Sequence, residues 1–377
     1  MTAPLRSLRI AGFRSIEDLT LELSSGVTML IGANGSGKSN IVDAFELLGT
    51  TVDRRLQRYV AVSGGFDSLL HRSRTGESAD RVVLKATGET SPEGWQNGYQ
   101  ASLLPAADDS AVVDEVTYTH QTKKHAKPYE HALGTAQESR LVLQAERSHV
   151  SNVYLHNLLS DCRVFHFDDT SSDAPPLRRA DTADNLTLHS DARNIAPLLM
   201  SMRDNEPDSF DRVVRSIRAV APFFEDFVLE PEGESVRLRW REAGLDGVFS
   251  GSAFSSGTLR FICLATLLQQ PDPPQVIVLD EPELGLHPAA IEQLAELMRL
   301  VGQERRILAA TQSVTLLSRF SVDEVAVVER VDGKTTVARP NASALSAWLD
   351  EYSLGELWEM NVLGGRPRPS AAWKRTA

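Results

Sequence analysis

The chain is poor in cysteine and has no long apolar run. Its 377 residues include two cysteines, Cys162 and Cys263. Two isolated cysteines exclude a disulfide framework and a cysteine-rich zinc site, and Cys263 is expected to be a small core residue of an apolar helix. No apolar run reaches about eighteen residues, and no charged-then-apolar leader follows Met1. We therefore expect a cytoplasmic protein that neither spans a membrane nor is exported.

Positive charge is also scarce, because 39 Lys and Arg oppose 51 Asp and Glu, for a net charge of −12. Such a chain has no overall attraction to nucleic acid or anionic lipid, so any nucleic-acid contact must be local. Each basic patch is predicted to be solvated surface charge, and the tail from residue 366, which contains two prolines, is predicted to be disordered. The patches are Arg54, Arg55 and Arg58; Arg72 and Arg74; residues 123–127; and Arg366, Arg368, Lys374 and Arg375.

A glycine-rich stretch carries the strongest chemical signal. Residues 32–39 fit the pattern GxxxxGK[ST], follow a buried-strand pattern at 27–31 and precede a helical pattern at 40–48. Glycines let backbone N–H groups turn inward toward phosphate oxygens, and the helix N-terminus adds partial positive charge. Lys38 is expected to bridge the β- and γ-phosphates of ATP, and Ser39 to hold Mg²⁺. The predicted nucleotide-binding residues here are Gly32, Asn34, Gly35, Ser36, Gly37, Lys38, Ser39 and Asn40.

A second segment supplies the acids that hydrolysis needs. Residues 276–279 are apolar and end in Asp280 and Glu281, a pattern typical of a strand buried on both faces with polar residues at its C-terminal end. Asp280 is expected to reach Mg²⁺ through water. Glu281 is predicted to orient or deprotonate the attacking water, with Lys38 as its electrostatic partner in catalysis.

Several segments of the chain together resemble a known family of ATPases. Residues 8–16 and 31–40 look like the start of ABC-type ATPases of the SMC and RecF-like group, and residues 254–260 are similar to the ABC signature motif, with Ser256 and Thr258 replacing the usual glycine and glutamine. The resemblance implies that Ser255 and Gly257 cap the γ-phosphate bound to the opposite subunit. It therefore implies an ATP-dependent homodimer with two composite sites.

Three further segments extend this resemblance to stand-alone AAA-labelled ATPases. Residues 282–288 resemble the segment after the catalytic glutamate in ATPases related to the overcoming-lysogenization-defect nucleases, and residues 352–358 resemble the C-terminus of stand-alone members. Residues 307–313 end a predicted strand where the family usually places a switch histidine. This chain has Gln312 there, which can hydrogen-bond a γ-phosphate but cannot carry positive charge, so we expect the site to turn over slowly or to sense nucleotide differently.

The predicted fold is α/β: an ABC-type P-loop ATPase head with a mixed, largely parallel core sheet, an antiparallel β subdomain and a helical signature-bearing lobe. Short alternating runs predict strands at 81–86 and 111–119, a strand is expected at 163–167, and i, i+3, i+4 spacing predicts helices between 195 and 224. His166, Asp168 and Asp169 are assigned structural or nucleotide-loop roles ahead of a metal site. The predicted segments are the P-loop part of the core (1–80), a β-rich insert (81–175), the helical lobe with connecting strands (176–250), the signature, paired acids and C-terminal core (251–340), and C-terminal helices with a flexible tail (341–377).

Three function classes stay open. The first is an ATP-hydrolysing switch that controls a partner protein or a nucleic-acid transaction in DNA repair or anti-phage defence; since no nuclease segment is appended, cleavage would fall to a separate effector, which could be a nuclease. The second is a transporter subunit, which needs a glutamine-bearing loop near residues 63–66, and Gln57 lies too near the first helix to supply it. The third is an ATP-binding scaffold with little turnover, which Glu281 opposes and Gln312 allows.

Overall fold

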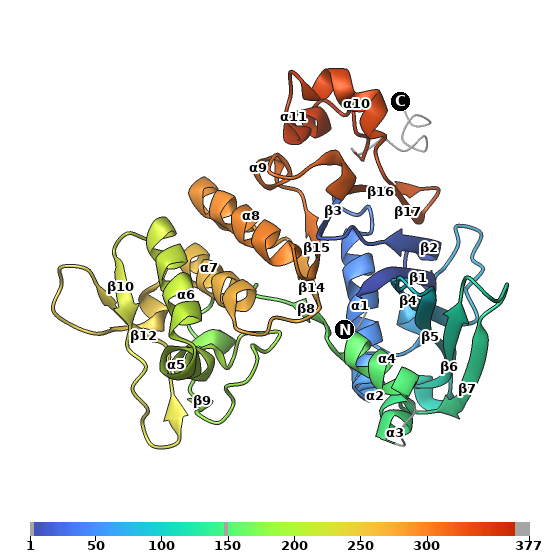
Figure 1. Ribbon diagram of the computed structural model, residues 1–377, viewed down its shortest axis with the longest axis horizontal. Helices are drawn as coiled ribbons and strands as arrows, with labels where there is room; N and C mark the ends of the chain where they lie inside the picture. Colours follow the sequence, from blue (N-terminus) through green and yellow to red (C-terminus); the bar gives the residue numbers. More distant parts are fainter. Residues whose placement is uncertain (1–3, 147–149, 366–377) are drawn as a thin grey trace. The chain divides into compact units, whose positions relative to one another are not determined.

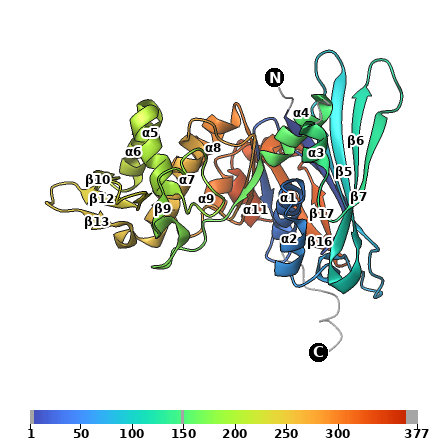
Figure 2. The same ribbon diagram turned by 90° about the horizontal axis from the view of Figure 1, so that it is seen from below.

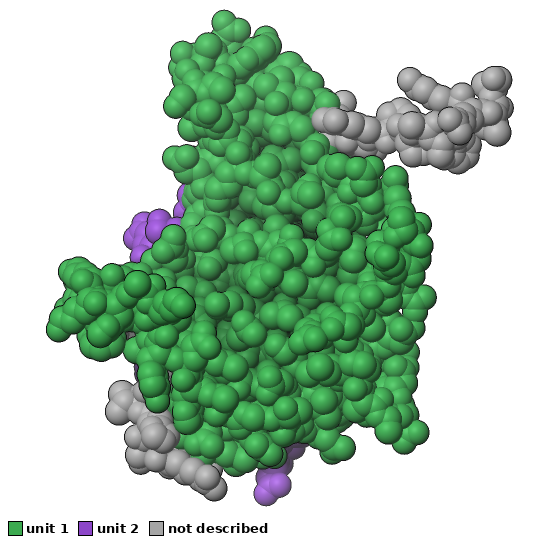
Figure 3. Space-filling view, turned by 90° about the vertical axis from the view of Figure 1, so that its right-hand side faces the viewer, with its two compact units in different colours: residues 1–24, 28–162, 310–377 green, residues 25–27, 163–309 purple. Residues whose placement is uncertain are grey.

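Residues 4–146 and 150–365 are described by a computed structural model (Figure 1). The chain divides into two compact units. The first unit comprises residues 1–24, 28–162 and 310–377, and the second comprises 25–27 and 163–309; Figure 3 shows the surface of the first in green. The basic tail predicted to be disordered lies outside the described residues. Within the described part of the chain, no helix combines the length and apolarity needed to cross a membrane.

One face of the first unit is a six-stranded antiparallel sheet (Figure 2). It confirms the strands predicted at 81–86 and 111–119, and in β4 the alternation places Val82, Leu84 and Ala86 in the core. The strand order is β2 (Ile16–Glu22), β1 (Leu5–Phe13), β4 (Val82–Gly88), β5 (Trp95–Pro105), β6 (Ala111–Gln121) and β7 (Tyr129–Ala136).

The predicted strand at 27–31 is confirmed as β3 (Val27–Ile31), in which every residue is buried. It pairs in parallel with β16 (Val325–Val331), which pairs antiparallel with β17 (Lys334–Ala338). The predicted helix after the glycine-rich loop is α1 (Lys38–Val52). The remaining helices of the first unit are α3 (Leu141–Glu146), α4 (Val150–Ser160), α9 (Val314–Leu317), α10 (Ala342–Leu349), α11 (Leu354–Glu359) and α2 (Leu56–Val62).

Helix α2 was not predicted, since residues 51–80 read as a loop-rich passage. The Glu138 carboxylate accepts the N–H groups of Leu56 (3.0 Å) and Gln57 (3.1 Å) and so caps the start of α2 from a distant part of the chain. Leu56 and Val60 on the same helix are buried. A cap supplied by a residue some eighty positions away leaves no local signal in the sequence.

The second unit holds the helical lobe. The predicted amphipathic pair is confirmed as α5 (Ile195–Asn205) and α6 (Pro207–Val220), and α6 buries Phe210, Val213 and Ile217. Strands β15 (Arg306–Thr311), β14 (Val276–Asp280) and β8 (Cys162–Phe165) are neighbours in that order, and β8 stops two residues before the predicted end. The other elements are α7 (Ser256–Gln269), α8 (Pro288–Gly302), β10 (Phe224–Phe227), β12 (Arg239–Glu242), β13 (Phe249–Ser250), β9 (Ala180–Asp181) and β11 (Ser235–Val236).

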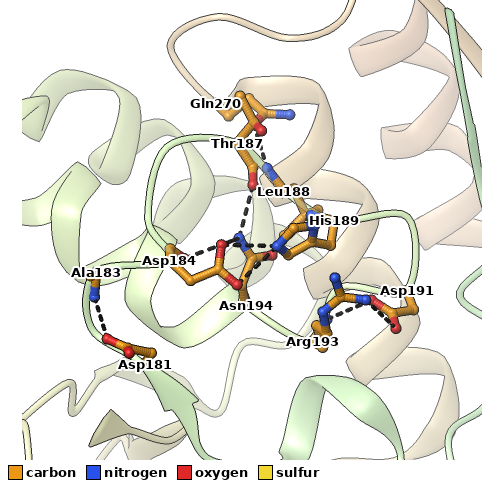
Figure 4. Close-up of polar contacts among 10 residues, drawn as sticks. All are labelled: Asp181, Ala183, Asp184, Thr187, Leu188, His189, Asp191, Arg193, Asn194 and Gln270. Atoms are coloured by element: carbon orange, nitrogen blue, oxygen red, sulfur yellow. Dashed lines mark hydrogen bonds and ion pairs between the residues drawn. The ribbon is translucent and has the colours of Figure 1, made fainter. Parts of the chain in front are cut away.

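The loop that leads into α5 is tied to the end of α7 (Figure 4). His189 Nε2 lies 2.9 Å from both carboxylate oxygens of Asp184, and the Asn194 side chain accepts the His189 N–H (2.9 Å) while donating to the Thr187 carbonyl (2.8 Å). Gln270, directly after α7, accepts the Leu188 N–H at 3.0 Å. These bonds hold the helical lobe against the helix that carries the predicted signature residues.

Candidate functional site

The loop between β3 and α1 takes the conformation that phosphate binding requires. Gly35 (φ 76°) and Gly37 (φ 106°) occupy backbone conformations that side-chain-bearing residues rarely adopt. Gly37 is the N-cap of α1, and no side chain caps this helix, whereas Ser255 caps α7 and Ser313 caps α9. A Cβ at Gly35 would meet nothing within 4 Å. The loop therefore leaves open space beside Gly35 at an uncapped helix N-terminus, which suits an anion.

The side chains of Lys38 and Ser36 also indicate phosphate binding by this loop. The Lys38 ammonium donates to the carbonyls of Gly32 (2.7 Å) and Ala33 (3.3 Å), so the side chain folds back over the loop and is almost fully buried. Ser36 Oγ is buried and finds no hydrogen-bond partner among the residues described. A buried hydroxyl normally has a partner, and a phosphate oxygen would provide one. Ser39, by contrast, is exposed at the first turn of α1.

Sequence reasoning missed Thr335 on β17, which supports the loop from the C-terminal part of the chain. Its hydroxyl donates to the Ser36 carbonyl (3.0 Å) and lies 2.6 Å from Ser15 Oγ, which accepts from the Asn40 amide at 2.6 Å. A Cβ at Gly37 would lie 2.0 Å from Thr335 Oγ1, so only glycine fits there. No local pattern marks Thr335, because its contacts are with residues some three hundred positions away.

A second C-terminal segment, also missed, supports the start of the loop. The Gly365 carbonyl accepts the Ala33 N–H at 2.8 Å, and the Gly365 N–H donates to Glu329 Oε1 at 2.8 Å. A Cβ on Gly365 would approach Val327 Cγ1 to 2.9 Å. The paired glycines at 364 and 365 are the only sequence signal for this contact.

A polar pocket of about 600 Å³ lies beside Ser15 and Asn40 in the first unit. Its other lining residues are Arg14, Gly64, Asp67, Ser68, Leu70, Arg72, Asp109, Arg330 and Gly333. The region 63–66 thus lines this pocket through Gly64. The Gln57 amide instead donates to the carbonyls of Ala111 (2.9 Å) and Gln137 (2.6 Å). Its hydrogen bonds therefore go to the ends of strands β6 and β7 in the antiparallel sheet.

The paired acids and the signature residues lie together in the second unit. Asp280 ends β14 after four buried apolar residues, and Glu281 begins the next loop with a left-handed backbone (φ 44°). Ser255 is exposed and caps α7 by accepting the Thr258 N–H at 3.1 Å. A Cβ at Gly257 would lie 2.4 Å from the Gly285 carbonyl oxygen. The start of α7 therefore packs directly against residues 281–287, the loop that carries Glu281.

The structure divides the predicted site residues into two sets. Those of the glycine-rich loop share the first unit with Gln312, which follows β15 and precedes the N-cap of α9. Asp280, Glu281, Ser255 and Gly257 belong to the second unit. Asp168, considered above beside His166, accepts a hydrogen bond from Arg260 at 2.9 Å, and Asp169 accepts from the N–H (3.0 Å) and hydroxyl (2.6 Å) of Ser171.

A phosphate-binding loop between a buried strand and a helix, with a second buried strand that ends in paired acids, defines a P-loop ATPase head. The family described as "AAA domain, putative AbiEii toxin, Type IV TA system" matches residues 27–318, and the chain belongs to this family. Together with the relatives below, this match makes the chain a P-loop ATPase of the SMC/RecF-like group. The relation to overcoming-lysogenization-defect nucleases stays a prediction.

The chain is 28% identical over 168 residues to the DNA replication and repair protein RecF of Exiguobacterium sp., covering 41% of this chain and 40% of that one. It is 34% identical over 90 residues to the chromosome partition protein Smc of Rhodopirellula baltica, covering 23% and 8%. The chain thus spans less than half the length of these curated relatives.

Two solved structures share the fold. One is the SmcHead bound to the C-winged helix domain of ScpA, with a TM-score of 0.61 at 15% identity over 90% of this chain and 99% of that chain. The other is the Smc head domain with an extended coiled coil bound to the C-terminal domain of ScpA, derived from Pyrococcus furiosus; its TM-score is 0.57 at 16% identity over 92% and 99%. The predicted fold class, an ABC-type head with a mixed core sheet, an antiparallel β subdomain and a helical lobe, is confirmed.

Proposed function

We propose that this chain binds and hydrolyses ATP with Mg²⁺ and works as a nucleotide-dependent switch. The observation that carries the proposal is the uncapped N-terminus of α1, which follows a loop with left-handed backbone at Gly35 and Gly37 and with Lys38 folded back onto its carbonyls. At this helix N-terminus the N–H groups of the loop would face the phosphates, and Lys38 would exchange its two carbonyl acceptors for phosphate oxygens. The adjoining polar pocket, with Asn40 at its edge, would take the nucleoside.

Mg²⁺ fits the donor set that the chain offers. Hard oxygen donors suit this ion, and it is usually held by one or two side chains together with substrate phosphates. Ser39 and Asp280 would hold it, and the bound ion would neutralise charge on the phosphates. Glu281 would orient or deprotonate the attacking water, and Gln312 would offer its amide to the γ-phosphate without adding charge.

The switch itself would be a homodimer closed by ATP, with Ser255 and Gly257 completing the site of the opposite subunit. The exposure of Ser255 at the start of α7 supports this role, since the residue is accessible to a second copy. The cycle would control a nucleic-acid transaction or a separate effector protein, which could be a nuclease, in DNA repair or anti-phage defence. The names of the RecF and Smc relatives favour a DNA transaction.

A scaffold with little turnover is the second candidate, because Gln312 replaces the expected histidine. A transporter subunit is disfavoured, since Gln57 is bonded within the antiparallel sheet. ATP turnover distinguishes the switch from the scaffold: a switch hydrolyses ATP in a manner that depends on Glu281, whereas a scaffold binds ATP and leaves it intact.

The test uses Glu281→Gln and Lys38→Ala, with Glu296→Gln on the exposed face of α8 as the matched charge control. Glu281→Gln should bind ATP, lose turnover and elute as an ATP-dependent dimer in size-exclusion chromatography with light scattering; Lys38→Ala should bind ATP weakly, and the control should match the wild type. A Glu281→Gln variant that hydrolyses ATP at the wild-type rate would refute the assignment. Short duplex DNA in a parallel run distinguishes the partners: co-elution with the dimer supports a DNA transaction, and its absence favours a protein effector.

A further inference from the structure

Arg260 is the one charged residue of helix α7. Residues 259–269 are all buried, and Arg260 retains 6% of its accessible surface. A charged side chain is seldom buried in this way unless its hydrogen-bonding capacity is met. The contacts of its guanidinium group should therefore reveal why α7 carries an arginine here.

The guanidinium group ties α7 to two other segments of the second unit. Nε donates to the Phe167 carbonyl just after β8 (3.0 Å), and Nη2 donates to Asp168 Oδ1 (2.9 Å). Nη1 donates to the Leu284 carbonyl at 2.6 Å, which lies in the loop after β14. The planar fork of arginine holds its five donors in fixed directions, whereas the ammonium group of a lysine is a compact charge on a flexible stem and fixes its acceptors less rigidly.

The Leu284 contact lies next to the proposed catalytic acid. Within the same loop, the Leu284 N–H donates to the Glu281 carbonyl at 3.1 Å. Arg260, Asp280 and Glu281 also line a common cavity of about 10 Å³, which is room for about one water molecule. Glu281 has a left-handed backbone, a conformation that persists only where its surroundings hold it.

We propose that Arg260 is a positioning residue for ATP hydrolysis, which holds residues 281–287 so that Glu281 faces the reaction and stays fixed to the helix that carries Ser255. The close approach of Gly257 to the Gly285 carbonyl is a second contact between the same two elements. Because α7 and residues 281–287 would then move as one rigid body, a displacement of Ser255 in the dimer interface would also displace Glu281. The proposal rests on the proposed function, because it assigns Arg260 to that reaction.

The arrangement predicts a split between catalysis and binding. The P-loop belongs to the other unit and makes its own contacts through Thr335 and Gly365, so ATP affinity should not depend on Arg260. The position of Glu281 should depend on it. Displacing a reacting group by about 1 Å can lower a rate by about a hundredfold.

The experiment compares Arg260→Ala and Arg260→Lys with Arg215→Ala, an exposed arginine on α6. We expect kcat to fall about ten- to a hundredfold in Arg260→Ala, with the Kd for ATP within about threefold of the wild type. Arg260→Lys should be intermediate, because an ammonium group restores charge but not the three-way contact. Arg215→Ala should match the wild type, and urea unfolding of all variants reports stability separately.

Chemical rescue separates positioning from packing. A cavity of about 250 Å³ adjoins Arg260, Leu259 and Cys263, so methylguanidinium has a route to the space vacated in Arg260→Ala. It should restore kcat without changing the unfolding midpoint, and methylammonium should restore little.

Wild-type kcat in Arg260→Ala, or a parallel loss of kcat, ATP affinity and stability that methylguanidinium leaves unchanged, would overturn the proposal. If Arg260→Ala does not fold, a wild-type kcat in Arg260→Lys overturns it. A wild-type protein that fails to hydrolyse ATP refutes instead the proposed function.

Discussion

Gly37→Ala tests the contact between the phosphate-binding loop and the C-terminal hairpin. Two costs arise in the folded state. A left-handed backbone costs an alanine about 1–2 kcal/mol, and the new Cβ would lie 2.0 Å from Thr335 Oγ1, an overpacking worth about 1–3 kcal/mol. We therefore expect the free energy of unfolding to fall by about 2–5 kcal/mol in total.

Thr335→Ala isolates the steric part of that cost. Alone, it removes the hydroxyl that bonds Ser36 and Ser15, at a cost of about 1–3 kcal/mol. Combined with Gly37→Ala, it also removes the two atoms nearest to the new Cβ, Oγ1 and Cγ2 of Thr335. The double variant should therefore be more stable than the sum of the single changes predicts, by about 1–3 kcal/mol, a coupling within the range for residues in contact.

Urea unfolding followed by tryptophan fluorescence measures all four proteins, and titration with a fluorescent ATP analogue measures affinity. About 1.4 kcal/mol corresponds to a factor of ten in an equilibrium constant, and the cost expected for Gly37→Ala exceeds this value. If the variant folds with the strain still in its loop, it should bind ATP at least about tenfold more weakly than the wild type. Additivity of the two changes within about 0.5 kcal/mol would refute the contact between Gly37 and Thr335. A Gly35→Ala control has the same type of backbone strain but open space at Cβ, so it should show no coupling to Thr335→Ala.

Three further predictions concern the second unit. Ser255→Arg should block ATP-dependent dimerisation but not ATP binding; light scattering that finds an unchanged dimer would contradict the composite site. Trp240→Ala should lower the free energy of unfolding by about 3–5 kcal/mol, because Trp240 is buried and stacks on Phe254 with ring centroids 4.5 Å apart, and equilibrium unfolding measures the loss. Burial raises the pKa of Cys263 to about 12, so its thiol stays protonated below that pH. Iodoacetamide at about pH 8 should label Cys263 only in urea, and mass spectrometry that finds rapid labelling of the folded protein would show the thiol to be accessible.

The glycine-rich loop and the two buried strands could be predicted because each is a short segment whose residue types are set by one physical requirement. The glycine-rich loop needs left-handed backbone at Gly35 and Gly37, and the apolar residues of β3 and β14 need burial on both faces, so composition alone marks them. Helices α5 and α6 were likewise predicted from the i, i+3, i+4 spacing of their apolar residues. Helix α2 was missed because its cap, Glu138, comes from a distant segment.

The sequence by itself determined the chemistry that is available: an anion-binding loop with Lys38 and Ser39, paired acids at a strand end, and a serine that starts α7. Only the tertiary structure decided what holds these groups in place. Thr335 and Gly365 reach the loop from the end of the chain, and Arg260 reaches the segment of Glu281 from the middle of a buried helix. The physical reason is that hydrogen bonds and steric exclusion act over a few ångströms in space, whatever the separation of the partners along the chain.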